Sequence, residues 1–501
     1  MSDSNPIPSP SSFPLPVVGI SGLSVYLPRW RVDLEQWCEW SGVPWAKISN
    51  VIGHAFRVPG PDENVYTMAA SAVLRLILDH DIPPQEVGFL GFGTESSTDN
   101  AAGAVIIKGM VDDALRRLGR PPLARACEAP EFKQACLGGV YALKGAARWL
   151  LCEGGTRSAI VVSADIAEYE RGSSGEPTQG AGAVAMWVQR DPKLLAVELE
   201  HSGSSSSYRE LDFRKPFARH LAPGYSAKTR RLHDFPVFNG RYSTTCYTDA
   251  VLHALDDLCR RTQLAPARIF DSHAAFVMHR PYHQMPIQAL SAARIWSLLY
   301  DDPKALAALC GEAGVEVAVL RDELLAPDEL RHLMHERGAD NELRPAFEAV
   351  ARHIRRTPEF RALVDASVGR GSEPAMQFGN LYTAALPAWL AAILDEAGRD
   401  PRGLDTGDAI LAIGYGSGDA AEALTLRLRP GWREAAARID LAGALDGYLD
   451  LDHAGYEAIH DRRETPRAAP PSSSPFQIEA VGERFEGAVQ DLGVERYAYV
   501  G

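Results

Sequence analysis

Several features are scarce in this chain of 501 residues, and each absence excludes a class of protein. Its seven cysteines are scattered and include no Cys-X-X-Cys pair, which excludes a disulfide scaffold and indicates a reducing compartment. No run of about 18 apolar residues occurs, so no membrane span is expected. With 65 acidic and 51 basic residues the net charge is −14, which disfavours binding to a nucleic-acid backbone. We therefore expect a soluble, cytoplasmic protein without a membrane or nucleic-acid partner.

The overall composition is that of a globular protein, with 46% hydrophobic and 23% charged residues. At roughly 100–200 residues per domain, the length allows two to four folding units or one large duplicated fold. Residues 1–16 are rich in proline and serine and have neither the basic block nor the apolar stretch of a signal peptide. We expect them to form a flexible tail.

Short apolar runs alternate along the chain with segments of helical periodicity. The runs predict strands at 17–27, 87–92, 159–163, 182–188, 276–278 and 409–414. Apolar residues at spacings of three and four predict helices at 65–79, 104–118 and 138–151. Strands that alternate with helices are typical of an α/β fold.

Three later segments depart from this alternation. Residues 289–372 are charged and helical in pattern, without a convincing strand, and are expected to form a helical insertion that serves as a lid or an oligomer contact. Residues 462–475 (RRETPRAAPPSSSP) are expected to be a surface linker. The segments 476–480 and 496–500 predict a last β-hairpin that docks on the body of the protein.

Polar residues follow several of the predicted strands at the point where each strand ends. Glu95 follows the apolar run that starts at residue 87, and His279 follows the run at 276–278. The run from 409 leads into a glycine-rich turn that contains Ser417. Ligand sites in α/β folds gather beyond the carboxyl ends of strands, so a shared site is expected here.

Cys136 lies in the segment KQACLGG at 133–139, directly before a predicted helix. The positive end of a helix dipole lowers a thiol pKa and favours the nucleophilic thiolate. Gly138 and Gly139 would allow a substrate to approach the backbone and would leave amide groups free as an oxyanion hole. The alternative is a buried structural cysteine, which is the reading we keep for the other six.

Glu95 is a candidate general base, since a dry pocket raises a carboxyl pKa towards neutrality; the alternative is a solvated or helix-capping acid. His279 is a candidate to polarise a carbonyl or move protons, and otherwise a structural histidine. Cysteine, acid and histidine without metal-ligand spacing suit covalent thioester chemistry. On spacing alone, a hydrolase with a Cys–His pair is the alternative. The glycine-rich segment at 180–183 is not a nucleotide-binding loop.

The chain resembles the 3-hydroxy-3-methylglutaryl-CoA (HMG-CoA) synthase family of thiolase-fold condensing enzymes from about residue 17 onwards. GTES at 93–96 is similar to the catalytic-acid motif of the family, ACLGG at 135–139 to its nucleophile motif and MHRPY at 278–282 to its histidine motif. Further similar blocks occur in the order that the family has them: ADIAEY at 164–169, GEPTQGAGAVAM at 175–186, DFRKP at 212–216, FPVFNG at 235–240, FGNLYT at 378–383 and YGSG at 415–418.

The resemblance implies a duplicated five-layer αβαβα fold, a homodimer, and CoA thioesters as substrates without a metal or other cofactor. The halves would be 17–195, with Glu95 and Cys136, and 196–501, with His279. The second half would include the helical insertion at about 289–372 and an extension at about 430–501.

The resemblance also implies a two-stage reaction of the mevalonate-pathway type. Cys136 would take an acetyl group from acetyl-CoA, with the amides of Cys136 and Ser417 as oxyanion contacts. Glu95 would deprotonate the acetyl methyl group, and the carbanion would attack acetoacetyl-CoA held by His279 and Asn380. Hydrolysis would then release the product. The other substrate-binding residues would be Asp165, Tyr169, Thr178, Asp212 and Phe213.

The chain departs from the family pattern at three points, two of which concern the acyl carrier. Leu137 stands where relatives have a tyrosine, which removes an aromatic polar group beside the thioester. Gln284 stands where many relatives have a CoA-contacting lysine, in a chain with only 8 lysines among its 51 basic residues. The segment EFKQAC at 131–136 resembles the β-branching synthases of polyketide assembly lines, which act on substrates bound to an acyl carrier protein. Such an enzyme is the first alternative, and a non-catalytic thiolase-fold binding protein is the second.

Overall fold

The computed structural model describes residues 16–97, 100–215, 235–326, 330–400, 403–461, 473–484 and 491–501. Nearly all of the expected tail at 1–16 and most of the expected linker at 462–475 lie outside these residues. A sheet of nine strands runs through the body, in the order β5-β4-β6-β7-β1-β8-β11-β10-β9. Its two parts meet where β1 (Val18–Tyr26) pairs with β8 (Leu195–Ser206) through only two residue pairs.

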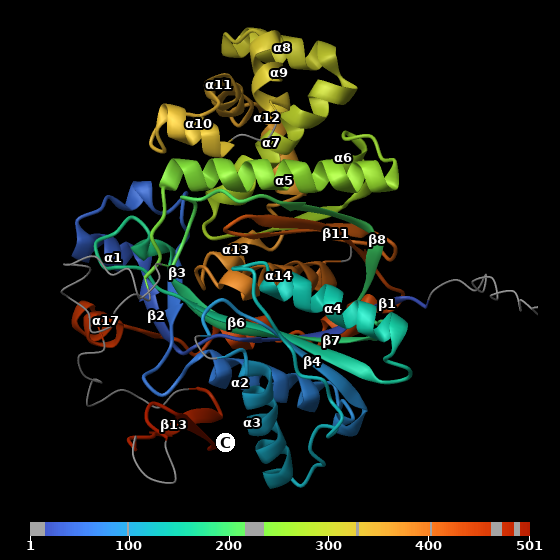
Figure 1. Ribbon diagram of the computed structural model, residues 1–501, viewed down its shortest axis with the longest axis vertical. Helices are drawn as coiled ribbons and strands as arrows, with labels where there is room; N and C mark the ends of the chain where they lie inside the picture. The colour runs from blue at the N-terminus through green and yellow to red at the C-terminus, as the bar shows by residue number, and fades with distance from the viewer. Residues whose placement is uncertain are drawn as a thin grey trace, which may run out of the picture.

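The elements stack in five layers (Figure 1). One sheet part contains β5 (Glu131–Phe132), β4 (Val87–Gly93), β6 (Ser158–Ala167), β7 (Gly180–Arg190) and β1, and the other contains β8, β11 (Ala420–Leu428), β10 (Ala409–Gly416) and β9 (Ala275–Met278). Between them lie α4 (Gly138–Cys152) and α14 (Ala385–Arg399), whereas the outer layers are α2 (Val65–Asp79) with α3 (Gly103–Arg117), and α5 (Gly240–Thr262). The predicted αβαβα arrangement is confirmed.

The two helices of the middle layer are apolar around most of their circumference because a sheet covers them on both sides. In α14 every residue from 385 to 394 is buried. A helix of this composition belongs in the interior of a protein, since no face of it is suited to water. The middle layer therefore fixes the distance between the two sheet parts. Helix α4 and the segment before it lie between these two parts.

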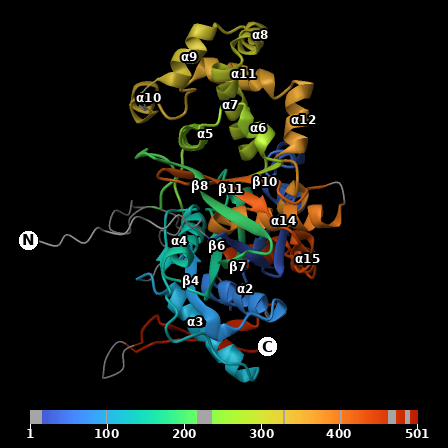
Figure 2. The same cartoon turned by 90° about the vertical axis from the view of Figure 1, so that its right-hand side faces the viewer.

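A cap of helices extends beyond α5 at the end of the molecule opposite α3 (Figures 1 and 2). After α7 (Gln284–Asp301) it contains α8 (Pro303–Ala313), α9 (Val317–Leu325), α10 (Leu330–Arg337), α11 (Pro345–Ile354) and α12 (Pro358–Ala366). The chain then returns to the body with α13 (Ser372–Ala375), which packs against α14. In α11 the buried residues Phe347, Val350, Ala351 and Ile354 form one apolar stripe. The described residues of 289–372 contain no strand, as predicted.

A small sheet connects the early and late parts of the chain. Its strands are β12 (Leu449–Asp450), β2 (Trp30–Asp33) and β3 (Ala55–Val58), in that order. Next to it lie α1 (Leu34–Ser41) and α17 (His453–His460), whose Tyr456 is buried in the same apolar cluster as Trp30 and Phe56. Residues near 456 are thereby fixed to the body of the protein. The remaining helices are α6 (Arg268–Ser272), α15 (Trp432–Ala436) and α16 (Leu441–Leu445).

The predicted final hairpin is confirmed as β13 (Phe476–Val481) and β14 (Glu495–Tyr499), which pair antiparallel and lie beside α3 (Figure 2). The amide of Ile478 donates to the carbonyl of Asp62 at 2.9 Å, and the guanidinium of Arg117 donates to the carbonyl of Tyr499 at 2.6 Å. No helix among the described residues is long and apolar enough to span a membrane.

Candidate functional site

The loop that carries Glu95 is held by a carboxylate on the neighbouring strand. Asp165, in β6, is fully buried, and its Oδ1 accepts hydrogen bonds from Thr94 Oγ1 (2.8 Å), from the amide of Glu95 (2.8 Å) and from the amide of Ser96 (3.0 Å). Its Oδ2 accepts from the amide of Thr383 at 2.9 Å. Both carboxylate oxygens of Asp165 thus serve the geometry of the loop, and its predicted contact with substrate stays a prediction.

Cys136 and Glu95 lie in contact, as the sequence predicts for a shared site. The thiol of Cys136 donates to Glu95 Oε2 at 3.2 Å, and the cysteine is 9% exposed. The preceding residue, Ala135, has a φ of 44°, in the left-handed region that residues other than glycine rarely occupy. Such backbone strain persists only where the surrounding structure enforces it, and it is common at functional sites.

The electrostatics of this pair confirm one expectation and correct another. Burial raises the pKa of Glu95 to about 7, with the Asp165 carboxylate adding to the effect and Lys215 opposing it. Burial, followed by the Glu95 carboxylate, raises the pKa of the Cys136 thiol well above its usual value. The expected lowering of this pKa by the α4 dipole is therefore wrong, because desolvation and a neighbouring carboxylate outweigh it. The resting pair consists of a thiol and a base.

The glycines after Cys136 serve packing of the protein itself. A Cβ on Gly138 would lie 2.6 Å from the carbonyl oxygen of Phe132, and one on Gly139 would overlap Ser163 Oγ and approach the carbonyl of Thr383. The amide of Gly138 donates to the carbonyl of Ala135 at 3.2 Å. The expectation that the glycines make room for substrate at their Cα atoms is therefore wrong, because neighbouring strands and loops occupy that space, and the Gly138 amide is already bonded; a free Gly139 amide stays a prediction.

The residue after the nucleophile, Leu137, faces the interior. It is fully buried, and a Cβ on Gly414 of β10 would lie 2.6 Å from its Cδ1. A Cβ on Gly416 would overlap the carbonyl of Gln134. The end of β10 thus packs against the Cys136 segment, which brings the Ser417 turn close to it. Leu137 is therefore a core residue that packs against β10.

His279 follows β9, next to β10 in the sheet. Met278 pairs with Ile413, whose carbonyl accepts a hydrogen bond from the amide of His279 at 2.8 Å. The hydroxyl of Tyr247 donates to the carbonyl of His279 at 3.1 Å, and the ring centroid of Tyr415 lies 6.0 Å from that of His279. Burial lowers the pKa of His279 to about 3, so the imidazole is neutral near pH 7.

An aromatic cluster surrounds Cys136. The ring of Tyr169 packs edge-on against Phe213 (6.2 Å) and Phe238 (5.9 Å), and Phe213 packs edge-on against Tyr382 (6.2 Å). Tyr169 and Phe213 were predicted here; Phe238 and Tyr382 lie in the blocks at 235–240 and 378–383, and their aromatic character is the signal that could have identified them. The cluster excludes water from the thiol, which is the cause of the raised pKa values.

Two further predicted residues lie next to this cluster with their polar atoms engaged. Asn380 is 1% exposed, and its Oδ1 accepts from the amide of Tyr382 at 2.9 Å. Thr178 is buried, and its hydroxyl donates to the carbonyl of Gly175 at 2.7 Å. Their contacts with substrate stay predictions.

Asp212 belongs to a buried carboxyl pair. The hydroxyl of Tyr415 lies 2.8 Å from Asp212 Oδ2 and 2.6 Å from Asp419 Oδ1. Burial and the charge of Asp212 raise the pKa of Asp419 to about 8. Because Tyr415 lies between this pair and His279, Asp212 is placed behind the histidine, while its predicted contact with substrate is untested.

The Gln284 amide donates to the carbonyl of Asn50 at 2.8 Å and so ties the start of α7 to the loop before β3. Within the described ranges, no group of three or more histidine, cysteine or acidic side chains is arranged to hold a metal ion.

The chain matches two family models over most of its length. A model of the hydroxymethylglutaryl-coenzyme A synthase N terminal region matches residues 15–193, and the corresponding C-terminal model matches residues 218–469. The hydroxymethylglutaryl-CoA synthase of Enterococcus faecalis is 26% identical over 443 residues, which cover 88% of this chain and 91% of that protein. The enzyme of Haloferax volcanii is 26% identical over 456 residues, which cover 89% and 91%.

Solved structures agree. The structure of MvaS in complex with 3-hydroxy-3-methylglutaryl coenzyme A is similar with a TM-score of 0.73 and 25% identity, covering 97% of this chain and 100% of that one. The HMG synthase of the curacin biosynthetic pathway, in complex with holo donor-ACP, shares the fold with a TM-score of 0.64 at 21% identity, covering 89% and 88%. The chain therefore belongs to the hydroxymethylglutaryl-CoA synthase family.

Proposed function

We propose that this protein condenses acetyl-CoA with acetoacetyl-CoA to form HMG-CoA, with Cys136 as the nucleophile and Glu95 as the general base. The observation that carries the proposal is the 3.2 Å contact between the Cys136 thiol and the Glu95 carboxylate in a water-poor pocket. The pKa of Glu95, about 7, is that of a general base that is substantially deprotonated near neutral pH and can also take up a proton there. In the proposed division, residues 17–195 supply this pair and residues 196–501 supply His279.

In the first stage, Glu95 takes the thiol proton as Cys136 attacks the acetyl carbonyl. The carbon–sulfur bond to CoA breaks, and the CoA thiolate leaves with that proton. In this proposal the amides of Cys136 and Ser417 stabilise the tetrahedral oxyanion. The product is acetyl-Cys136, with Glu95 ionised again.

In the second stage, Glu95 removes a proton from the acetyl methyl group, and the carbanion attacks C3 of acetoacetyl-CoA. Neutral His279 donates a hydrogen bond to the oxygen of that carbonyl, and Asn380 helps to hold the acceptor. The new alkoxide takes the proton that Glu95 removed from the methyl group, which leaves Glu95 ionised, and water then cleaves the thioester at Cys136. HMG-CoA is released and the free thiol is restored.

The rate of condensation is expected to depend on the ionisation of Glu95. Because its pKa is about 7 and the base acts only when deprotonated, kcat should approach a plateau above pH 7 and fall about tenfold per pH unit well below it. Single-turnover condensation of pre-acetylated enzyme between pH 5 and pH 9 measures this profile. A rate independent of pH between 5 and 7 would assign the base to another group.

The acyl carrier of the acceptor separates the proposed function from its alternative. By the family resemblance, Gln284 stands where many relatives have a lysine, and its amide donates to the carbonyl of Asn50. This position therefore offers no cation to a CoA phosphate. A carrier-protein acceptor is for this reason the second candidate. The test compares kcat/KM for acetoacetyl-CoA and for an acetoacetyl-loaded acyl carrier protein. We expect turnover of the CoA thioester at least equal to that of the loaded carrier. A strong preference for the carrier would instead support a β-branching enzyme, and inactivity with both would contradict the proposal.

A homodimer is proposed as well, and light scattering tests it.

A further inference from the structure

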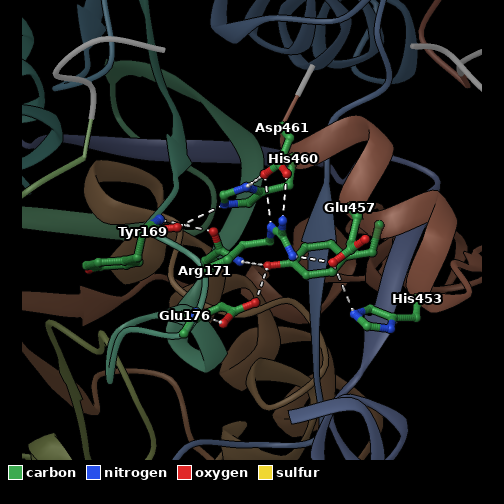
Figure 3. A network of polar contacts seen from close by, with 10 residues as sticks. Tyr169, Arg171, Glu176, His453, Glu457, His460 and Asp461 are labelled. Carbon is green, nitrogen blue, oxygen red and sulfur yellow. Dashed lines mark hydrogen bonds and ion pairs between the residues drawn. The ribbon is translucent and has the colours of Figure 1, made fainter. Parts of the chain in front are cut away.

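Helix α17 and the following residue contact the segment that carries Tyr169, 291 positions earlier in the chain (Figure 3). The Nε2 atom of His460 lies 2.9 Å from the carbonyl oxygen of Tyr169. The amide of Tyr169 donates to Gln179 Oε1 at 3.0 Å, and Gln179 Nε2 donates to the hydroxyl of Tyr456 at 2.8 Å. Both backbone polar atoms of Tyr169 are therefore held by α17, one directly and one through Gln179.

The contacts of His460 define its protonation. A carbonyl oxygen can only accept, so the hydrogen bond to Tyr169 requires a proton on Nε2. The other ring nitrogen, Nδ1, lies 3.1 Å from Asp461 Oδ1. If Nδ1 had no proton, its lone pair would face a carboxylate oxygen; both contacts are satisfied together only by the doubly protonated ring.

Asp461 is ionised in this arrangement. Its carboxylate accepts from Arg171 Nε at 2.9 Å and from Arg171 Nη2 at 2.6 Å, a two-point ion pair. Burial opposes ionisation, but the bonds from Arg171 and His460 outweigh it and lower the pKa of Asp461. The acceptor that faces Nδ1 is thus a carboxylate and cannot supply the proton itself.

The charges around His460 balance when its ring is positive. Arg171 also pairs with Glu457, so two cations, Arg171 and His460, face two carboxylates, Glu457 and Asp461. The Nε2 atom of His453 lies 3.5 Å from Glu457 Oε1, the oxygen that Arg171 also contacts, and its side chain is half exposed.

A further buried acid and an aromatic ring lie beside this network. Glu176 accepts from the hydroxyl of Tyr456 at 2.8 Å and from the amide of Gly172 at 2.6 Å. The ring of Phe235 stacks on His460 at 5.5 Å. Glu168 and Glu170 flank Tyr169 in the sequence.

We propose that His460 is a positioning residue for the reaction at Cys136: as an imidazolium bound to Asp461, it holds the carbonyl of Tyr169 and thereby keeps the Tyr169 ring against the nucleophile. When the ring loses one proton, one of its two contacts is lost and Tyr169 is less firmly held. A misplaced group near a reaction centre lowers the rate without contacting substrate. The inference rests on the proposed role of Cys136.

The first test compares pH profiles. The variant His460→Gln cannot become positive, so its single-turnover condensation should be about tenfold slower than that of the wild type at the acid end of the pH range, and this deficit should shrink as the pH rises. The ionisation of Glu95 affects both proteins and cancels in this ratio. His453→Gln, on the same helix, removes a contact with Glu457 and a stacking contact with Trp40 but leaves both ring contacts of His460 in place; it is the control and should leave the ratio near one. A ratio that stays constant with pH, or an equal effect of the control, would reduce His460 to a packing role and overturn the inference.

Two further readouts do not depend on condensation. In protein with ¹⁵N-labelled histidine, the His460 resonances, assigned by their loss in His460→Gln, should be those of an imidazolium at the acid end of the pH range; a ring that stays neutral there would overturn the proposal. The rate of Cys136 alkylation by iodoacetamide, followed by mass spectrometry of its peptide, should rise in His460→Gln at pH 6 and stay unchanged in His453→Gln. If His460→Gln does not fold, Asp461→Ser replaces it, because Arg171 keeps Glu457 as a partner, and the same pH-dependent ratio is expected. These readouts stay decisive even if the condensation activity is absent.

Discussion

Replacing Cys136 by serine is expected to abolish formation of the acyl-enzyme and to lower kcat by about 10⁴-fold or more. A serine hydroxyl is far less acidic than a thiol, and in this pocket burial already raises the pKa of the nucleophile well above its usual value. Glu95, with a pKa of about 7, is too weak a base to ionise a hydroxyl in its place. Incubation with [¹⁴C]acetyl-CoA, followed by proteolysis and mass spectrometry, measures label at residue 136.

The control for this variant is the cysteine at the far end of α4, the helix that follows Cys136. Cys152 is the last residue of α4 and its side chain is exposed, whereas Cys136 lies before the first turn in the aromatic cluster. Cys152→Ser should acetylate and turn over like the wild type. Wild-type protein that takes up no label, or Cys136→Ser that takes up as much label as wild type, would contradict the role of Cys136.

The second large effect is expected from Glu95→Gln, which should accumulate acetyl-enzyme and condense about 10²–10⁴-fold more slowly. The amide has nearly the shape of the carboxylate, and the loop stays bound to Asp165 through backbone amides, so the geometry is preserved. What is lost is the group that removes the methyl proton. Acetylation is less affected, because removal of the Glu95 charge also removes one of the causes that raise the pKa of the Cys136 thiol, so the thiol ionises more readily without a base beside it.

The measurement separates the two stages by quenching: labelled acetyl-enzyme is formed first, acetoacetyl-CoA is then added, and the product is followed. Glu86→Gln is a suitable control, since Glu86 is exposed at the start of β4 while Glu95 follows its end. Condensation by Glu95→Gln at the wild-type rate would place the base elsewhere. Loss of acetylation and condensation to the same degree would indicate that Glu95 acts on the thiol alone.

The sequence predicted the strands that end at the site, and for a physical reason. The run at 87–92 and the run at 409–414 are buried on both faces, so their apolar character is continuous and their ends are visible as a change to polar or glycine residues. By contrast, β8 and β11 were not predicted. β8 ends in the polar segment HSGSSS, and about half of the strand is only partly buried or exposed. Neither a continuous apolar run nor a regular alternation therefore identifies it.

The site was predictable where a motif carries the chemistry and unpredictable where distant residues shape it. The contact of Glu95 with Cys136 was predictable because the end of β4 and the start of α4 meet at the same site. Asp165 holds the Glu95 loop by binding residues 94–96 with one oxygen and Thr383 with the other. This role could not be predicted, because Thr383 lies 218 positions away in the sequence. The pKa of Cys136 was mispredicted for the same reason, since a helix dipole is local in sequence whereas the burial that outweighs it is not.

The contact between α17 and Tyr169 also sets an order of events during synthesis. Glu95, Cys136 and Tyr169 emerge early from the ribosome, but His460 is added 291 residues after Tyr169. At 5–20 residues per second, this interval is roughly 15–60 s. During that time the nucleophile exists without the helix that braces its aromatic wall. A nascent chain of this protein that has not yet reached residue 460 therefore lacks the contact between His460 and the Tyr169 carbonyl.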